Sequence, residues 1–418
     1  MAAQLQAKWP SQLFAILILL LLHCANAFAQ QYHDIFTDEC LRLDYMFSGN
    51  SRESAISLYR VQKQGVWAGR TTSLDALQAK AYIMMEAKDE ASGTTVFRTA
   101  GSTLFDEWRA TDEAKTLTRS MPYVMLMPMP KRPVVISMFQ TNSRHDTIAT
   151  HTYRFDPSDI LMRQAKPVTY PTRQLLHSGK TADCIDLVIL AEGYTIDEQD
   201  KFFADAQRIS DELFTYRPFD ELKSHFNITA VAAPSAESGT SYPKEGKWAS
   251  TLLGSHFSTF YSDRYLTASD LPRVHDQLAG IPYDHIVVLV NTPTYGGGGF
   301  YNMLTLTAAD NEMWSQLFVH ELCHGLIGLA DEYDYASGDE LYHAGVEPYE
   351  ENLTTLTDFA SKWKDMLEAG TAELIEGGGY MVHDVYRPAK DCMMRSFLHR
   401  DFCPVCRRAI IRYVEKQK

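Results

Sequence analysis

Two histidines stand four residues apart inside an apolar segment, and this spacing constrains the fold more than any other feature of the chain. Residues 320–324 read His-Glu-Leu-Cys-His, and the apolar periodicity of residues 312–329 predicts a helix around them. Because four residues turn a helix by about 400°, His320 and His324 are expected on one face. Two imidazoles so placed can bind one zinc ion, with Glu321 beside them to take a proton from a metal-bound water. A helix with two ordinary packed or surface histidines is the alternative.

The residues after His324 predict where this helix ends and how a third ligand reaches the metal. Gly328 is the expected end, because glycine accepts the left-handed conformation that terminates a helix. The chain can then return an acidic side chain, for which we expect Asp331, with Glu332 as the competitor. Three protein ligands leave a fourth position open for water, as in catalytic rather than structural zinc sites.

The first 29 residues are predicted to be a signal peptide. Lys8 precedes an apolar stretch at residues 13–22, which is too short to span a bilayer, and small residues follow up to Ala29. Lipid attachment at Cys24 is the alternative, but His23 is too bulky for the small residue that such cleavage normally needs. We therefore expect an exported protein. After residue 30 no run of about 18 apolar residues predicts a membrane span.

The composition narrows the class of protein further. Apolar residues make up 45% of the 418 residues, which is enough to build a proper core. The formal net charge of -14 argues against nucleic acid as a partner, because it leaves no basic face to follow a phosphate backbone.

The pattern of the chain predicts a multidomain fold of the α+β or α/β class. An antiparallel β-sandwich is expected at residues 30–160, where short segments rich in β-formers alternate with turns. These segments are 55–62, 81–87, 94–99, 123–129, 134–140 and 148–155. An α/β catalytic domain is expected at residues 166–418, with strands at 185–191, 226–233 and 285–291 and a helix at 197–216. We expect the sandwich to be an accessory domain that supplies no metal ligand and no acid–base group.

Four consecutive glycines, at positions 296–299, stand between aromatic residues shortly before the histidine motif. Glycine costs backbone entropy in a strand unless another backbone approaches it closely. An edge strand above the metal that pairs with an extended substrate fits this position, and a flexible loop is the alternative.

The cysteines form one cluster in the sequence. Cys403-Pro-Val-Cys406 follows Cys392 closely, and the three could form a disulfide with one thiol left over. The other interpretation is a structural zinc site that adds His399 to the three cysteines.

Several motifs together resemble the IgA-peptidase family of zinc metallopeptidases. They read HELCHGLIGLADEY, with YGGGGFYN before it and CMMR and FCPVC after it. In the N-terminal half, FRTAGSTLFDEWRAT resembles the β-sandwich domain associated with that family. The resemblance implies a metzincin-like catalytic domain in which His320, His324 and Asp331 bind zinc, Glu321 is the general base and Met394 lies in a turn beneath the metal. The spacing from His324 to Gly328 and Asp331 is one residue longer than the usual metzincin pattern.

The sequence therefore predicts an exported zinc endopeptidase with one catalytic Zn²⁺. Tyr386 could donate a hydrogen bond to the developing oxyanion, although an ordinary packed aromatic is the alternative. The substrate would be a protein or glycoprotein, with immunoglobulin A and mucin-type proteins among the possibilities. A zinc exopeptidase and a non-catalytic surface-binding protein, such as an adhesin, are the competing functions.

Overall fold

The computed structural model describes residues 32–77, 79–335 and 341–417. The predicted signal peptide and Cys24 lie outside these residues. Within the described part of the chain, no helix is both long and apolar enough to cross a membrane.

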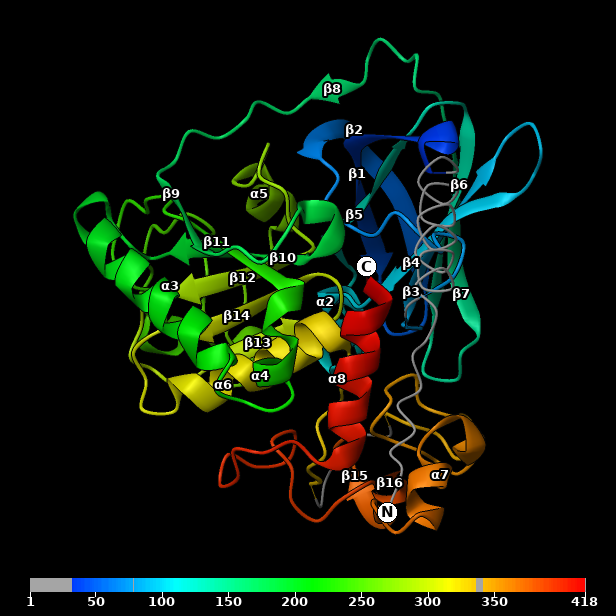
Figure 1. Ribbon diagram of the computed structural model, residues 1–418, viewed down its shortest axis with the longest axis vertical. Helices are drawn as coiled ribbons and strands as arrows, with labels where there is room; N and C mark the ends of the chain where they lie inside the picture. Colours follow the sequence, from blue (N-terminus) through cyan, green and yellow to red (C-terminus); the bar gives the residue numbers. More distant parts are fainter. Residues whose placement is uncertain (1–31, 78, 336–340, 418) are drawn as a thin grey trace, which may run out of the picture.

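The N-terminal half is built from two four-stranded sheets (Figure 1). The first sheet has the order β5-β1-β2-β8, and its strands are β1 (Phe36–Gly49), β2 (Ser54–Val66), β5 (Arg119–Pro130) and β8 (Arg163–Gln164). The second has the order β4-β3-β6-β7, and its strands are β3 (Ile83–Asp89), β4 (Thr95–Gly101), β6 (Val134–Thr141) and β7 (Thr147–Phe155). A short helix, α2 (Leu104–Arg109), separates β4 from β5. All six strand segments expected here correspond to strands, whereas β1 and β8 were not predicted.

Alternation of side chains explains how these strands form a core. In β6, Val134, Ile136 and Met138 are buried, while the residues between them are only partly buried. This two-residue period places one face of the strand against the facing sheet. Strand β1 differs, because a run of consecutive residues along it is buried on both faces.

The C-terminal half contains a six-stranded sheet of order β13-β14-β12-β10-β11-β9. Its strands are β9 (Thr172–Leu176), β10 (Ile185–Glu192), β11 (Phe226–Val231), β12 (His285–Val290), β13 (Gly297–Phe300) and β14 (Leu304–Ala308). The four central strands are parallel, and the two edge strands, β9 and β13, run antiparallel to their neighbours. The molecule is thus a mixed α/β protein with several sheets.

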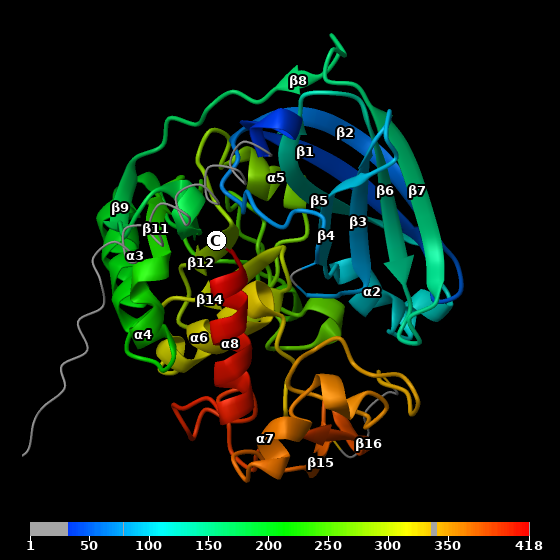
Figure 2. The ribbon, with the colours of Figure 1, turned by 45° about the vertical axis from the view of Figure 1, so that its right-hand side comes forward.

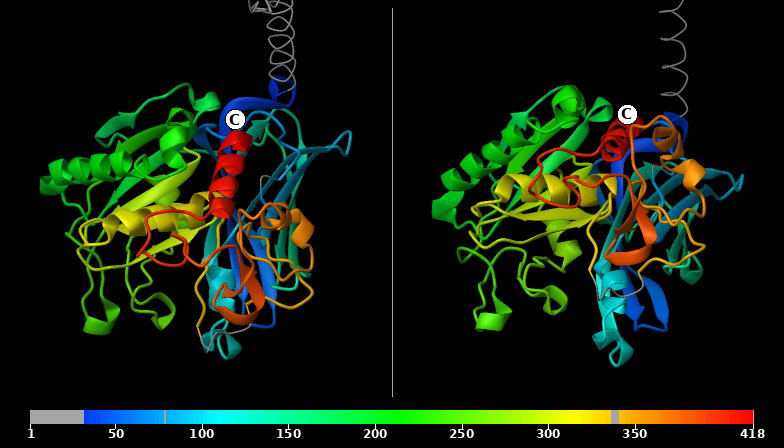
Figure 3. Two further views of the ribbon diagram at one scale, coloured as in Figure 1. Left: turned by 60° about the horizontal axis from the view of Figure 1, so that its bottom comes forward. Right: turned by 90° about the horizontal axis from the view of Figure 1, so that it is seen from below.

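The helices of this half are α3 (Gln199–Leu213), α4 (Phe219–Leu222), α5 (Leu271–Asp276), α6 (Trp314–Leu322), α7 (Lys364–Glu368) and α8 (Pro404–Gln417). A hairpin of β15 (Ile375–Gly378) and β16 (Met381–Arg387) lies between α7 and α8 in the chain. Seen from below, the segment that carries this hairpin lies on the sandwich side of the molecule (Figure 3, orange). The ring of Tyr349 in this segment stacks on that of His145 from the sandwich, with 3.8 Å between the ring centroids.

Each face of the six-stranded sheet packs against different elements. Along β10, Ile185, Leu187 and Ile189 join the core formed with α3, α6 and α8. Val188 and Leu190 point the other way, into a core shared with α5 and the sandwich strands. The two halves of the chain therefore share one continuous hydrophobic core.

Ionic contacts also join the halves. The Arg42 guanidinium of β1 is fully buried and lies 2.6 Å from the buried Asp44 carboxylate. It also lies 2.7 Å from Asp276 of α5 and donates a hydrogen bond to the backbone oxygen of Pro272. This network explains the two buried faces of β1, because the face turned away from the sandwich core packs on α5.

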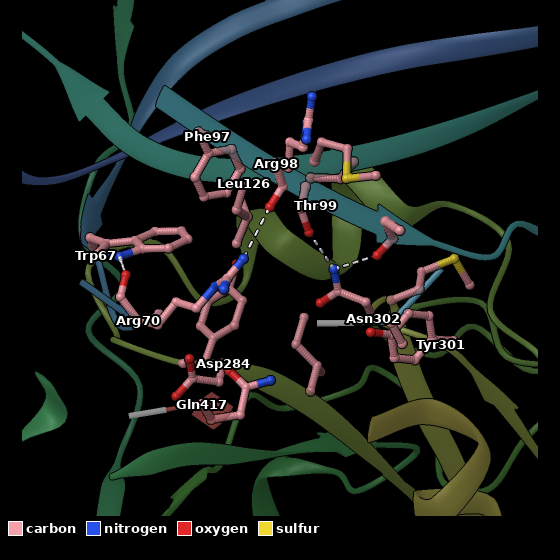
Figure 4. Close-up of a pocket in the computed structure, with 18 of the residues that line it drawn as sticks. Trp67, Arg70, Phe97, Arg98, Thr99, Leu126, Asp284, Tyr301, Asn302 and Gln417 are labelled. Carbon is pink, nitrogen blue, oxygen red and sulfur yellow. Dashed lines mark hydrogen bonds between the residues drawn. The ribbon is translucent and has the colours of Figure 1, made fainter. Parts of the chain in front are cut away.

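A cavity of about 90 Å³ lies where the two halves and α8 meet (Figure 4). Figure 2 shows α8 running along this junction. Arg70 in the cavity wall donates to the backbone oxygens of Ser73, Ala76 and Arg98, and the Asn302 amide donates to Thr99 and Ala100. The bonds of Arg70 stay within the N-terminal half, whereas those of Asn302 join the two halves.

Candidate metal centre

The helix that carries the histidine motif ends as the sequence predicts. Helix α6 is followed by a π-helical turn over Cys323–Ile327, and Gly328 then adopts a left-handed conformation with φ of 79°. The Gly328 N–H donates to the backbone oxygen of Cys323, five residues earlier. A π-turn adds one residue to a helical turn. The spacing from His324 to Gly328 is one residue longer than in the usual metzincin pattern, and the π-turn accommodates this extra residue.

The structure brings His320, His324 and Asp331 together. The two Nε2 atoms lie 3.0 Å apart, and the Oδ1 atom of Asp331 lies 3.1 Å from His320 Nε2 and 3.3 Å from His324 Nε2. A tetrahedral ion with ligand bonds of about 2.0–2.1 Å would separate its ligand atoms by about 3.3 Å. Glu332, the competing residue, turns away from the histidines and lies among three cysteines.

Hydrogen bonds to the backbone fix the orientation of both imidazoles. His320 Nδ1 lies 3.1 Å from the backbone oxygen of Met393, and His324 Nδ1 lies 2.6 Å from that of Leu329. A carbonyl can only accept, so each Nδ1 carries a proton, and Nε2 is the nitrogen of each ring that can bind a cation in the cluster. Asp331 Oδ1 is buried and has no hydrogen-bond partner. Three acceptors that face one another fit a bound cation.

The electrostatics of the cluster also favours a bound cation. Burial tends to lower the pKa of His324, but the Asp331 carboxylate outweighs it and raises this pKa to about 9. Burial tends to raise the pKa of Asp331, but the two imidazoles hold it well below its usual range. Positive charge is therefore stabilised at the point where these side chains meet.

The other oxygen of Asp331 is held by two tyrosines. Tyr333 donates to Oδ2 at 2.8 Å, and Tyr380, which follows β15, also donates to this atom. Asn352 holds the backbone of Ala330, the residue before Asp331, because its amide group bonds to both the N–H and the oxygen of Ala330. Tyr333 could have been noticed in the sequence because it follows Asp331 by two positions, but no local pattern marks Tyr380 or Asn352.

The glycine run forms an edge strand rather than a flexible loop, and its pairing with an extended substrate stays a prediction. Strand β13 pairs with β14, and its glycines let it lie directly on the helix that carries the histidines. A β-carbon on Gly297 would come within 2.8 Å of the Glu321 side chain. Part of the outer edge of β13 is already covered, because the Leu266 N–H donates to the Gly297 oxygen at 3.4 Å.

Glu321 lies beside the two histidines in the sequence and in space. Burial raises the pKa of its carboxyl group, and the imidazoles of His320 and His324 oppose this effect. A raised pKa favours a carboxylate that accepts a proton and releases it again near neutral pH.

The sandwich reaches the surroundings of the centre through α2. Tyr265 donates a hydrogen bond to the Glu107 carboxylate of α2, and its ring stacks on Phe300 of β13 with 6.1 Å between the ring centroids. Among the described residues, the sandwich adds no side chain to the His320–His324–Asp331 cluster. The accessory role of the sandwich stays a prediction, and the sequence did not reveal the contact through Glu107.

The last two residues singled out in the sequence lie near the C-terminus. Met394 is fully buried, and its backbone oxygen accepts from the Glu332 N–H at 2.8 Å. Tyr386 lies in β16, where its backbone pairs with Thr354. Its role in catalysis stays a prediction, because the tyrosines found in contact with the cluster are Tyr333 and Tyr380.

The cysteine cluster differs from the predicted one. Cys392, Cys403 and Cys406 lie together with Glu332, and none of the described cysteines forms a disulfide. His399, which the zinc interpretation of the sequence added to the three cysteines, is exposed and lies 3.5 Å from Asp391 instead. The fourth member of the cluster is Glu332, whose carboxylate is distant from the three cysteines in the sequence.

Comparison with known proteins agrees with the resemblance noted in the sequence. A family model described as IgA Peptidase M64 matches residues 174–375 and 373–414. A second, described as Peptidase M64 N-terminus, matches residues 31–152. No curated protein matches the chain.

Proposed function

Because the chain belongs to the IgA peptidase M64 family, whose members are metallopeptidases, we propose that it is an exported, zinc-dependent endopeptidase. The observation that carries the proposal is the convergence of three acceptor atoms, from His320, His324 and Asp331, at one buried point. Two imidazoles and one carboxylate form a ligand set typical of catalytic zinc, with room for a fourth, exchangeable ligand. The proposed export depends on the signal peptide predicted from the sequence.

In this proposal, His320, His324 and Asp331 hold the metal. A bound zinc ion would lower the pKa of a water molecule to about 7 and polarise the scissile carbonyl group. Glu321 accepts the proton of the attacking water on its carboxylate and delivers it to the departing amine. Burial supports this role, because it raises the pKa of Glu321 toward the range in which a carboxylate can both take and release a proton.

Tyr333 and Tyr380 position the third ligand. Their hydroxyl groups occupy Oδ2 of Asp331 and leave Oδ1 free to face the histidines. Such outer hydrogen bonds keep a ligand in one orientation and tune its affinity for the metal. Tyr386 is proposed as a donor to the oxyanion that develops on the scissile carbonyl.

The substrate class follows from the family, since a peptidase acts on proteins. Immunoglobulin or mucin-like proteins are proposed candidates, because a shared catalytic domain fixes the chemistry rather than the sequence that is cleaved. A zinc exopeptidase is the competing enzyme, and a non-catalytic binding protein is the competing function of another class.

One experiment separates these functions. The purified protein is incubated with a complex peptide mixture, with and without a chelator, and the products are identified by mass spectrometry. We expect internal cleavage that the chelator abolishes and added zinc restores. Stepwise loss of single terminal residues would indicate an exopeptidase, and no cleavage by a zinc-loaded protein would favour a binding role.

The general base is tested by Glu321→Gln, with Glu312→Gln as the control because Glu312 is exposed on the same segment. We expect Glu321→Gln to lower kcat by about 10²–10⁴ with unchanged metal content. Unchanged turnover in a folded, zinc-loaded Glu321→Gln protein would contradict the role of this residue.

A further inference from the structure

A second cluster of potential metal-binding side chains lies next to the His320–His324–Asp331 cluster. Cys392, Cys403, Cys406 and Glu332 are each at most 4% exposed, and their potential ligand atoms all lie within 4.8 Å of one another. They come from three parts of the chain: the segment after Asp331, the segment before Met394, and the start of α8. None of these residues takes part in the proposed catalysis.

The separation of the sulfur atoms fits a shared metal ion rather than a disulfide. The Sγ atoms of Cys392 and Cys406 lie 3.8 Å apart. A disulfide requires about 2.05 Å, whereas tetrahedral zinc with bonds of about 2.3 Å to sulfur separates its sulfur ligands by about 3.8 Å. Glu332 Oε1 lies 3.1 Å from the Sγ atom of Cys406. The four side chains thus present a compact set of three sulfurs and one oxygen.

The surrounding backbone is arranged to stabilise thiolates. The N–H of Cys403 points to Cys392 Sγ at 3.3 Å, and the N–H of Cys406 points to Cys403 Sγ at 3.4 Å. Cys403 directly precedes α8, a helix of 14 residues. The N-terminus of a helix carries partial positive charge, which favours a negatively charged ligand atom at this position.

The carboxylate of Glu332 gives an independent indication of a ligand. The residue is fully buried, and its Oε2 atom has no hydrogen-bond partner. Its Oε1 atom accepts from the Asn352 amide at 3.0 Å. A buried carboxylate with an unpartnered oxygen beside three thiols lacks the positive charge that would compensate its burial.

We propose that Glu332, Cys392, Cys403 and Cys406 bind a structural zinc ion. Thiolates select zinc among the common divalent ions, and four protein ligands leave no position open for water, as in zinc sites that stabilise folds. A zinc ion at this site would hold in place two backbone segments that position the catalytic centre. Glu332 follows Asp331 directly, and Cys392 precedes Met393, whose oxygen orients His320.

The test is a count of zinc per chain in the full-length protein. We expect two equivalents in the wild-type protein and one in His320→Ala/His324→Ala. X-ray absorption of this double variant should show zinc–sulfur distances of about 2.3 Å. Cys403→Ser/Cys406→Ser should lose the sulfur-bound zinc, whereas Cys184→Ser, which removes a thiol outside the cluster, should keep both ions.

Two results would overturn the proposal. The first is a histidine variant that is folded but free of metal, with all three thiols open to alkylation after denaturation. The second is a native mass that shows a disulfide between two of the three cysteines. If the cysteine variant does not fold, the wild-type protein loaded with Co²⁺ decides the question, because only sulfur ligation gives a thiolate-to-cobalt charge-transfer band. Failure of the catalytic site alone would leave one sulfur-bound zinc in the wild-type protein, so the two proposals fail separately.

Discussion

Gly299 of the edge strand lies directly against His324 of the metal centre. A β-carbon built on this glycine would come within 2.6 Å of the His324 Cβ atom and 2.2 Å of the Glu321 backbone oxygen. No side chain fits in this space, so glycine at this position is a condition for strand β13 to lie on the helix. The geometry of the centre therefore depends on a residue that has no chemical function of its own.

The first prediction concerns this contact. Gly299→Ala should force β13 away from the helix and lower the free energy of unfolding by about 1–3 kcal/mol, the usual cost of overpacking. Because His324 moves with the helix, zinc affinity should fall as well. Thermal unfolding and a zinc titration measure the two effects.

Gly298→Ala is the matched control in the same strand. A β-carbon there would meet its nearest neighbour, the Leu266 oxygen, at 3.1 Å, which small shifts can relieve. Equal losses of stability and zinc affinity in both variants would show that the contact between Gly299 and His324 has no special importance.

The second prediction concerns the tyrosines that hold Asp331. Tyr333→Phe/Tyr380→Phe removes both donors to Oδ2, which frees the carboxylate to rotate. Zinc affinity should fall by about 10–100-fold, as is usual when outer-shell hydrogen bonds of a metal ligand are lost. Tyr335→Phe is the control, because the Tyr335 hydroxyl bonds to Arg264 and not to Asp331. A competition assay with a fluorescent zinc chelator would give the three affinities.

The third prediction concerns the ionic contact between the two halves. Arg42→Ala leaves the Asp44 carboxylate buried without its main partner and should destabilise the protein by about 3–5 kcal/mol. Arg154→Ala removes an ion pair with Glu90 whose arginine side chain is 52% exposed, and its effect should be much smaller. Denaturant unfolding compares the two. A small effect of Arg42→Ala would show that Arg60, which also binds Asp44, is a sufficient partner.

The fourth prediction concerns pH and Asp106 of α2. Burial raises the pKa of this carboxyl to about 7, although Gln140 and Arg109 oppose the shift. Between pH 4 and 7 the folded protein therefore keeps a proton that the unfolded chain releases, so this residue makes the free energy of unfolding fall as pH rises. The slope is at most about 1.4 kcal/mol per pH unit.

Asp106→Asn removes this titration and keeps an acceptor for Gln140. The stability of Asp106→Asn relative to the wild-type protein should thus increase from pH 4 to pH 7 and stay constant above. Asp112→Asn, at an exposed position, should show no such trend in that range. A difference between Asp106→Asn and wild type that does not change with pH would mean that Asp106 is ionised throughout.

The local features of the site were predictable from the sequence. The helix around His320 and the left-handed Gly328 each follow from residue spacing and backbone preferences over a few residues, whereas the glycine run left a strand and a loop as equal alternatives. These constraints act along the chain and need no knowledge of distant residues.

Other features depend on contacts that no local pattern records. Strand β1 was not predicted, although Leu41, Leu43 and Tyr45 alternate with Arg42 and Asp44. The burial of these two charged side chains becomes favourable only against α5, which no local pattern records. The position of Glu332 is set by three cysteines that lie 60 or more residues further along the chain. Tyr380 reaches Asp331 only because the 379–380 segment pairs with residues 331–335.

The adjacency of Asp331 and Glu332 has a consequence for how this chain can vary. The side chains of these two adjacent residues belong to two different clusters, so the clusters are separated here only by the backbone of residues 331 and 332. Deleting a single residue between Gly328 and Asp331 would move Glu332 to the position of Asp331 and Tyr333 to that of Glu332. The histidine cluster would then receive a longer side chain, and the cysteine cluster would receive no carboxylate. The number of residues in this segment is thus more tightly constrained than their identity, and a variant with altered length should lose both centres in one step.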